Sequence, residues 1–103
     1  MSAVDASQAV RAAVISYAET QAHFDIAPLV EPIEIRGPYA LADWTAGHKS
    51  GEVLLVRANG TWTVIVLQNS SLLDANYLHL RYHVPRDDAA ALVKALSAAE
   101  KAY

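Results

Sequence analysis

The dipeptide Asn59-Gly60 separates two runs of residues that favour β-strands, 52–58 and 61–68. Both residues tolerate a positive φ, which a type I′ turn requires at its two central positions, so they predict a two-residue β-hairpin. The predicted cross-strand partners are Arg57 with Trp62, Val56 with Thr63, Leu55 with Val64, Leu54 with Ile65 and Val53 with Val66. This hairpin is apolar on both faces, although an antiparallel sheet usually leaves one face in water. Its second face must therefore be covered, either by the C-terminal segment or by a second copy of the protein.

Two more strand-like runs, 30–36 and 39–46, precede that hairpin and are joined by Gly37-Pro38. Period-two alternation gathers apolar residues on one face, which we expect to pack against a helix: Ile33, Ile35, Ala40, Ala42 and Trp44. The other face is expected to contact water and carries Glu34, Arg36, Tyr39, Leu41 and Asp43. The helix that covers the apolar face is predicted over residues 5–23, where apolar side chains recur at helical spacing.

The segment after the second hairpin allows two interpretations. Ser71 and Asp74 fit the start of a short helix over about 72–82, whereas apolar and polar residues alternate over 78–84 in the manner of a strand. We favour the helix and keep the strand as the alternative.

Pro85 then interrupts the chain, and a last helix is predicted over 86–101. The sequence therefore predicts a single α+β domain over residues 1–103. In this architecture an N-terminal helix packs on a four-stranded antiparallel meander, which two C-terminal helices follow.

Composition argues against several classes of function. The net charge is -3 and the eight Lys and Arg are scattered, whereas nucleic-acid binding needs a clustered basic face. The absence of cysteine excludes disulfides and thiol catalysis. No apolar run approaches the roughly 20 residues that span a bilayer, and the first ten residues lack the basic and apolar regions of a signal peptide. We therefore expect a cytoplasmic protein with neither nucleic acid nor membrane as a partner.

Several short motifs, spread from about residue 5 to residue 100, suggest a family. They are VEP at 30–32, YALADW at 39–44, the small-residue turn at 47–51, LL at 54–55, Trp62, VP at 84–85 and AE at 99–100. In this order they resemble small bacterial proteins labelled copper uptake system-associated, which implies a transition metal as a partner. A helix followed by a four-stranded meander also resembles the cystatin-like arrangement, a scaffold that serves binding, inhibition and catalysis alike.

His79 and His83 are the sharpest candidate metal ligands, because residues four apart on a helix share one face. Zinc or Cu(II) would need a further ligand, for which Asp74 and His48 are candidates. Cu(I) is disfavoured, because it prefers sulfur and the single methionine is Met1. The alternative is that both histidines are ordinary surface residues, and this alternative is the commoner one.

Trp44 and Trp62 could line a ligand pocket between the sheet and the first helix, although large aromatic residues on strands are more often core. His48 and Lys49 could bind an anion in the turn at 47–51, although a polar hairpin loop is the better interpretation. His23 is best explained by the favourable dipole at the end of the first helix. No ionisable side chain is expected on the inward faces described above, although Glu31 could lie in register with Trp44.

These observations predict a small, non-enzymatic accessory or binding protein that forms a homodimer through its spare apolar face. One alternative is a metal-handling protein that uses His79 and His83. A second alternative is a small-molecule-binding domain of cystatin-like or NTF2-like form, with its pocket at Trp44 and Trp62. A small enzyme ranks last, and a buried ionisable group inside a cavity would raise it. No resident cofactor is expected.

Overall fold

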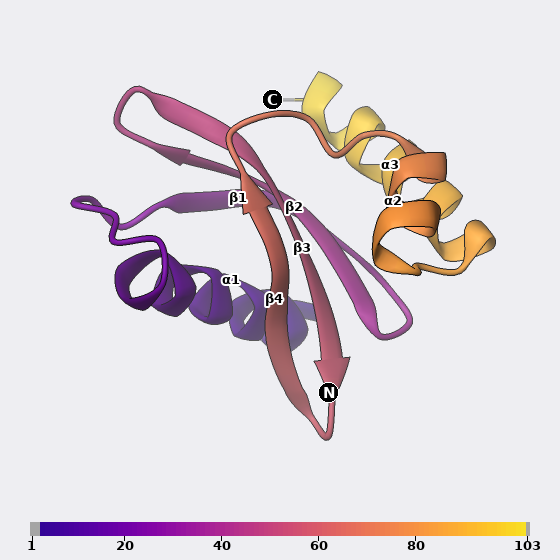
Figure 1. Cartoon of the computed structure of the whole chain (residues 1–103), viewed down its shortest axis with the longest axis horizontal. Coiled ribbons are helices and arrows are strands. Elements are labelled where there is room, and N and C mark those ends of the chain that lie inside the picture. The colour runs from indigo at the N-terminus through magenta and orange to yellow at the C-terminus, as the bar shows by residue number, and fades with distance from the viewer. Residues whose placement is uncertain (1–2, 103) are drawn as a thin grey trace.

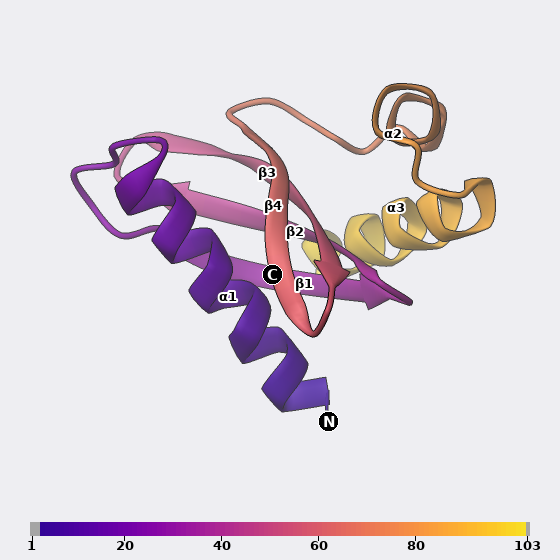
Figure 2. The ribbon, with the colours of Figure 1, turned by 60° about the horizontal axis from the view of Figure 1, so that its bottom comes forward.

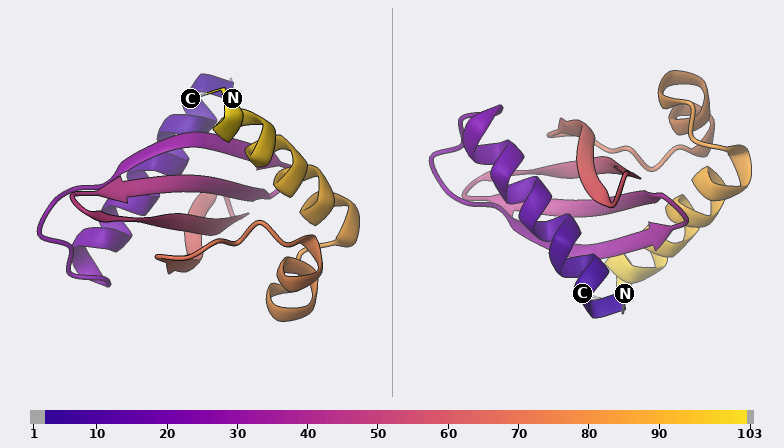
Figure 3. Two further views of the ribbon diagram at one scale, coloured as in Figure 1. Left: turned by 90° about the horizontal axis from the view of Figure 1, so that it is seen from above. Right: turned by 90° about the horizontal axis from the view of Figure 1, so that it is seen from below.

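The computed structural model describes residues 3–102. Within this range the elements are α1 (Ala3–Thr20), β1 (Leu29–Arg36), β2 (Tyr39–Ala46), β3 (Lys49–Ala58), β4 (Thr61–Gln68), α2 (Ala75–Tyr82) and α3 (Arg86–Lys101). The strands form one antiparallel sheet in the order β1-β2-β3-β4. Figures 1, 2 and 3 show α1 against one face of the curved sheet, and α3 with α2 beside it on the other side. The predicted α+β architecture is confirmed.

Positive φ values mark the three turns of the meander. Asn59 and Gly60 have φ of 55° and 78°, the pair of positive values that the β3–β4 turn was predicted to need. In the other two turns the first central residue is a glycine, Gly37 with φ 56° and Gly47 with φ 64°. Because the β2–β3 turn contains two residues only, β3 begins at Lys49, earlier than predicted.

A β-bulge changes the predicted register of the second hairpin. The partners nearest the turn are as predicted, namely Arg57 with Trp62, Val56 with Thr63 and Leu55 with Val64. The register then shifts between Leu54 and Leu55, so that Leu54 pairs with Val66 and Val53 with Leu67. The predicted pairs of Val53 with Val66 and of Leu54 with Ile65 are therefore wrong. The extra residue on β4 lets this edge strand bend and twist, which a straight ladder does not allow.

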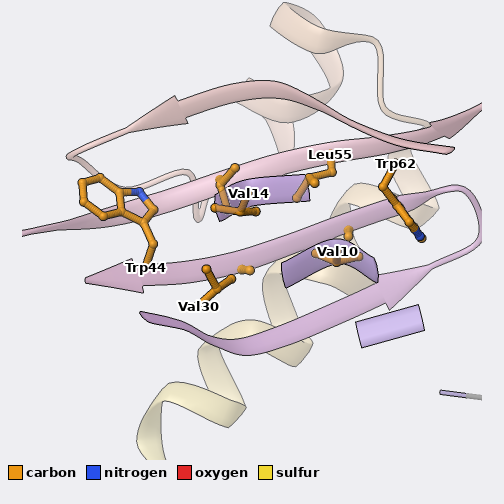
Figure 4. Close-up of a cluster of buried hydrophobic side chains, with 9 residues drawn as sticks. Val10, Val14, Val30, Trp44, Leu55 and Trp62 are labelled. Carbon is orange, nitrogen blue, oxygen red and sulfur yellow. The ribbon is translucent and has the colours of Figure 1, made fainter. Parts of the chain in front are cut away.

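The face of the sheet that contacts α1 was predicted correctly. Val10 and Val14 of α1 are fully buried against it, and Figure 4 shows them among the strand side chains. The sheet side of this cluster consists of Val30, Ala40, Ala42, Trp44, Val53, Leu55 and Trp62, with Ile33 and Ile35 packed beside them. Small alanines on β2 leave room for the helix, as period-two alternation suggested.

The opposite face is not in water, and this prediction was wrong. Leu41 is fully buried there, and Tyr39 is half-buried. The covering layer is apolar and comes from the C-terminal segment: Leu72, Leu78, Val84, Ala89, Leu92 and Leu96. The same layer covers Leu54 on the reverse of the second hairpin. The C-terminal segment, one of the two predicted covers, therefore buries Leu54, while Val56, Ile65 and Val66 stay half-buried.

The ambiguous segment forms a helix rather than a strand. Asp74 caps α2 by accepting a hydrogen bond from the Tyr77 N–H, with the two atoms 3.1 Å apart. The strand alternative over 78–84 is therefore wrong, and Leu78 is the residue of α2 that reaches the core. No helix within residues 3–102 has both the length and the apolar character that crossing a membrane requires.

The first helix ends earlier than predicted, at Thr20 rather than near residue 23. The Phe24 N–H donates back to the Ala18 carbonyl over 2.8 Å, and His23 takes a left-handed φ of 54°. A left-handed residue after the last turn is a common end to a helix, although glycine is the usual residue at that position. The segment that follows α1 is therefore tied to the helix end by backbone hydrogen bonds.

Candidate functional site

The two histidines predicted as metal ligands lie at the end of α2. Nδ1 of His79 is 2.9 Å from the Val84 carbonyl oxygen, so one of its two nitrogens contacts the backbone. His83 is the C-cap of α2, with a left-handed φ of 62° and an exposed side chain. Of the suggested further ligands, Asp74 caps the other end of α2, and His48 lies in the β2–β3 turn at the opposite end of the molecule (Figure 1). The metal site at His79 and His83 stays a prediction.

The two tryptophans belong to the core beneath α1 and lie at opposite ends of it (Figure 4). The side chain of Trp44 is 1% exposed, and its indole N–H donates to the Gln68 carbonyl over 3.1 Å. Trp62 is 7% exposed, and its indole N–H has no hydrogen-bond partner. Arg57 lies over the Trp62 ring at 5.6 Å from the centroid, as the hairpin register suggested. The two tryptophans thus lie apart, and Trp44 borders the cavity that is described next.

Three carboxyl groups converge at the end of the sheet where α3 finishes. Asp43 of β2 and Glu52 of β3 are cross-strand partners, and Glu100 comes from the last turn of α3. Within residues 3–102 these three form the one set of at least three His, Asp or Glu residues whose ligand atoms lie within 4.8 Å of one another. Glu52 is 5% exposed and accepts a hydrogen bond from the Leu72 N–H. The expectation that no ionisable side chain faces inward was therefore wrong.

This crowding favours protonated carboxyl groups. The pKa of Asp43 rises from 3.8 to about 8, first because of burial and then because of hydrogen bonding to Glu100 and Glu52 and their negative charge. Burial also raises the pKa of Glu52. The hydrogen bond from the Leu72 N–H has the opposite, smaller effect, because it stabilises the ionised form. Like charges this close cannot all ionise at neutral pH without a compensating cation. The cluster therefore holds protons that a cation can replace.

A cavity of about 350 Å³ opens over the cluster. Its lining consists of Asp43, Trp44, Thr45, Ser50, Gly51, Glu52, Asn69, Ser70, Ser71 and Glu100. The segment after β4 supplies one wall, because Gln68 donates from Nε2 to the Ser70 hydroxyl over 2.9 Å and to the Ser71 carbonyl over 3.1 Å. The cavity thus combines carboxyl groups on its floor with hydroxyl and amide groups at its rim.

Gly51 is required for this wall to approach the sheet. A Cβ atom at Gly51 would lie 1.9 Å from the carbonyl oxygen of Gln68 and 2.6 Å from Cα of Asn69. Only glycine therefore lets the chain leaving β4 pass this close to β3. The same close passage places the Leu72 N–H against the buried carboxylate of Glu52.

The sequence reasoning missed this cluster, although part of the signal was present. A two-residue turn at Gly47-His48 pairs Ala46 with Lys49 and hence Asp43 with Glu52, and like charges directly opposite one another are unfavourable in a sheet. Working out that register would have singled out the pair. Glu100 carries no such local signal, because α3 brings it there only in the folded chain.

Comparisons of the chain with protein-family models, curated proteins and solved structures found no match. The resemblance to copper uptake system-associated proteins stays a prediction. The function of this chain has to be argued from its own cavity and side chains.

Proposed function

We propose that this protein is a small, non-enzymatic binding protein that holds a small molecule by its ammonium group. The observation that carries the proposal is the convergence of Asp43, Glu52 and Glu100 on the floor of a cavity of about 350 Å³. Pockets for small molecules begin at roughly 300 Å³ and place a few convergent polar groups where they orient the ligand. The hydroxyl and amide groups at the rim supply further hydrogen bonds to the rest of such a ligand.

An ammonium group suits this floor better than a bare metal ion does. Either cation has to displace the proton that Asp43 holds at neutral pH, because the pKa of Asp43, raised first by burial, is about 8. An ammonium group brings three N–H donors to three carboxyl acceptors, and such charge-assisted hydrogen bonds are strong. The cavity also leaves room for the carbon skeleton that an ammonium ligand carries.

Binding rather than catalysis is proposed because Glu52 supports the fold. Its carboxylate accepts the Leu72 N–H and so holds the segment that forms the cavity wall. A second candidate is acid–base catalysis in the same cavity. One observation favours it, namely that the raised pKa of Asp43 lies near neutrality, where a general acid or base works best.

Calorimetry with simple amines tests the binding proposal. The probes are n-butylamine and 1,4-diaminobutane, with n-butanol as the neutral compound of matching shape. We expect the amines to bind and the alcohol not to bind, and we expect Asp43→Asn and Glu100→Gln to weaken amine binding about tenfold or more. Glu31→Gln is the control, because Glu31 is exposed on β1 and lies outside the cluster.

The pH dependence adds an independent readout. Because the ammonium replaces a proton held at Asp43, binding releases a proton and tightens as the pH rises from about 6 to about 8. Equal binding of butylamine and butanol, or amine binding that survives both cluster variants, contradicts the proposal. Binding of Ca²⁺ or Mn²⁺ in place of the amines, lost in the same variants, would assign the cluster to a metal and overturn the ammonium ligand.

The homodimer also stays a prediction. The C-terminal segment of the same chain covers Leu54 on the reverse of the second hairpin, but Val56, Ile65 and Val66 stay half-buried there. Light scattering at high micromolar concentration measures the oligomeric state, and a monomer there removes this part of the prediction.

A further inference from the structure

A second cavity lies at the far end of the sheet from α2. It has a volume of about 230 Å³ and forms where the α1–β1 connection meets the β2–β3 turn. Figures 1 and 3 show these two connections at the same end of the sheet. A Cβ atom at Gly47 would lie 3.5 Å from Cδ1 of Ile26, which shows that the two segments are in contact.

Two imidazoles and a carboxylate line this cavity, from His23, Asp25 and His48. All three side chains are exposed, and none has a hydrogen bond or ion pair to any other residue within the range 3–102. This differs from His79, whose Nδ1 contacts the Val84 carbonyl oxygen. His23 and His48 therefore keep both ring nitrogens available, and they reach the cavity from separate segments of the chain.

The backbone holds these residues in place. The Phe24 N–H bonds to the Ala18 carbonyl at 2.8 Å, and this bond keeps His23 in its left-handed conformation at the end of α1. His48 occupies the second position of a two-residue turn whose first residue is Gly47. A left-handed φ is uncommon for a residue other than glycine, and such conformations cluster at functional sites.

We propose that His23, Asp25 and His48 bind a divalent transition-metal ion of the Zn²⁺ or Co²⁺ type. Two imidazole nitrogens and one carboxylate oxygen are a donor set for these ions, whereas Ca²⁺ and Mg²⁺ prefer oxygen ligands alone. The three donors are farther apart than the 4.8 Å limit that the carboxyl cluster meets, so binding requires rotation of the exposed side chains. Water completes the coordination, which makes this an open site.

Lys49 limits the choice of ligand at this cavity. Its ammonium group lies 5.9 Å from the centroid of the Phe24 ring, which lines the same cavity. Together with the histidines Lys49 could instead attract an anion, but Asp25 in the same lining opposes that. The carboxylate therefore favours a cation as the ligand.

Zn²⁺ calorimetry and the visible absorption of bound Co²⁺ test the site. We compare the wild type with His23→Asn and His48→Gln, since both residues are exposed and asparagine tolerates a left-handed φ. The control is His83→Asn, which changes another exposed, left-handed histidine. Each site variant should weaken Zn²⁺ binding about tenfold or more and remove the Co²⁺ absorption band, while the control binds like the wild type.

Three results would overturn the site. They are no Zn²⁺ binding tighter than about 1 mM, equal binding in His23→Asn and His83→Asn, and preferential binding of inorganic phosphate that needs Lys49. Asp43→Asn separates this site from the carboxyl cluster. Zn²⁺ binding that survives Asp43→Asn supports the histidine site whatever the amine experiments show, and binding lost in Asp43→Asn assigns the metal to the cluster instead.

Discussion

Replacing Asp43 by asparagine should make the protein more stable at alkaline pH. The side chain lies between Glu52 and Glu100, and burial, followed by its contacts with these two residues, raises the pKa of Asp43 to about 8. Asparagine keeps the shape of the side chain and cannot ionise, so the variant removes the charge and little else. The wild type must either keep a proton there or hold a third negative charge in the cluster.

The direction of this change in stability follows from the pKa of Asp43 in the unfolded chain and in the folded protein. The unfolded chain loses its proton near pH 3.8, while the folded protein keeps it to about pH 8, so the stabilising proton is fully effective below pH 3.8 and lost by about pH 8. This difference in pKa corresponds to at most about 5–6 kcal/mol, at about 1.4 kcal/mol per pKa unit. Asp43 is only half-buried and shares its proton with its neighbours, so we expect about 2–3 kcal/mol to be measurable.

Urea denaturation at about pH 4 and about pH 9 measures this effect. The free energies of unfolding of Asp43→Asn and the wild type should agree at the acid end, and the variant should be more stable by about 2–3 kcal/mol at the alkaline end. Glu31→Gln serves as the control, because its exposed position should give a difference of less than about 0.5 kcal/mol at both pH values. A difference between Asp43→Asn and the wild type that does not change with pH would refute the reasoning.

Two further predictions concern packing, and urea denaturation at neutral pH checks both. Gly51→Ala should destabilise the fold by about 3 kcal/mol or more, because its Cβ would lie 1.9 Å from the Gln68 carbonyl oxygen. Gly37→Ala is the control: a Cβ there has open space, so the variant should lose only about 1–2 kcal/mol from its positive φ. Equal losses of stability in the two variants would contradict the close approach at Gly51. Leu41→Ala should cost about 2–5 kcal/mol, because this side chain is fully buried, and Leu80→Ala, 69% exposed, should change stability by less than about 0.5 kcal/mol. If the two leucine variants were equally stable, α3 would not cover the face that carries Leu41.

Short-range signals accounted for most of the secondary structure. The positive φ values at Asn59 and Gly60 and the break at Pro85 depend on backbone preferences that act over two to four residues, whereas α2 begins at Ala75 rather than near residue 72 as predicted, because Asp74 is its N-cap. Period-two alternation likewise identified the strand residues that pack against α1, since the direction of each side chain follows from its position along the strand.

Where that reasoning failed, the missing information was the position of distant elements. Leu41 was assigned to water because most other residues on its face of the sheet are polar. In the structure α3 lies across that face and buries Leu41. The β-bulge that shifts the pairing of Leu54 places the extra residue, Ile65, inside a continuous apolar run, so the residue pattern near it does not mark its position. Neither outcome is encoded within a few residues of the position concerned.

The candidate sites likewise depend partly on local sequence and partly on the packing of distant segments. Local turn chemistry is enough to place Asp43 opposite Glu52, because a two-residue turn sets the register of the strands it joins. Glu100 joins that pair, and His23 and Asp25 share a cavity with His48, only because helices and connections from separate parts of the chain meet in space. Charge, burial and ligand geometry depend on distances of a few ångströms between such segments, and those distances exist only once the chain has packed.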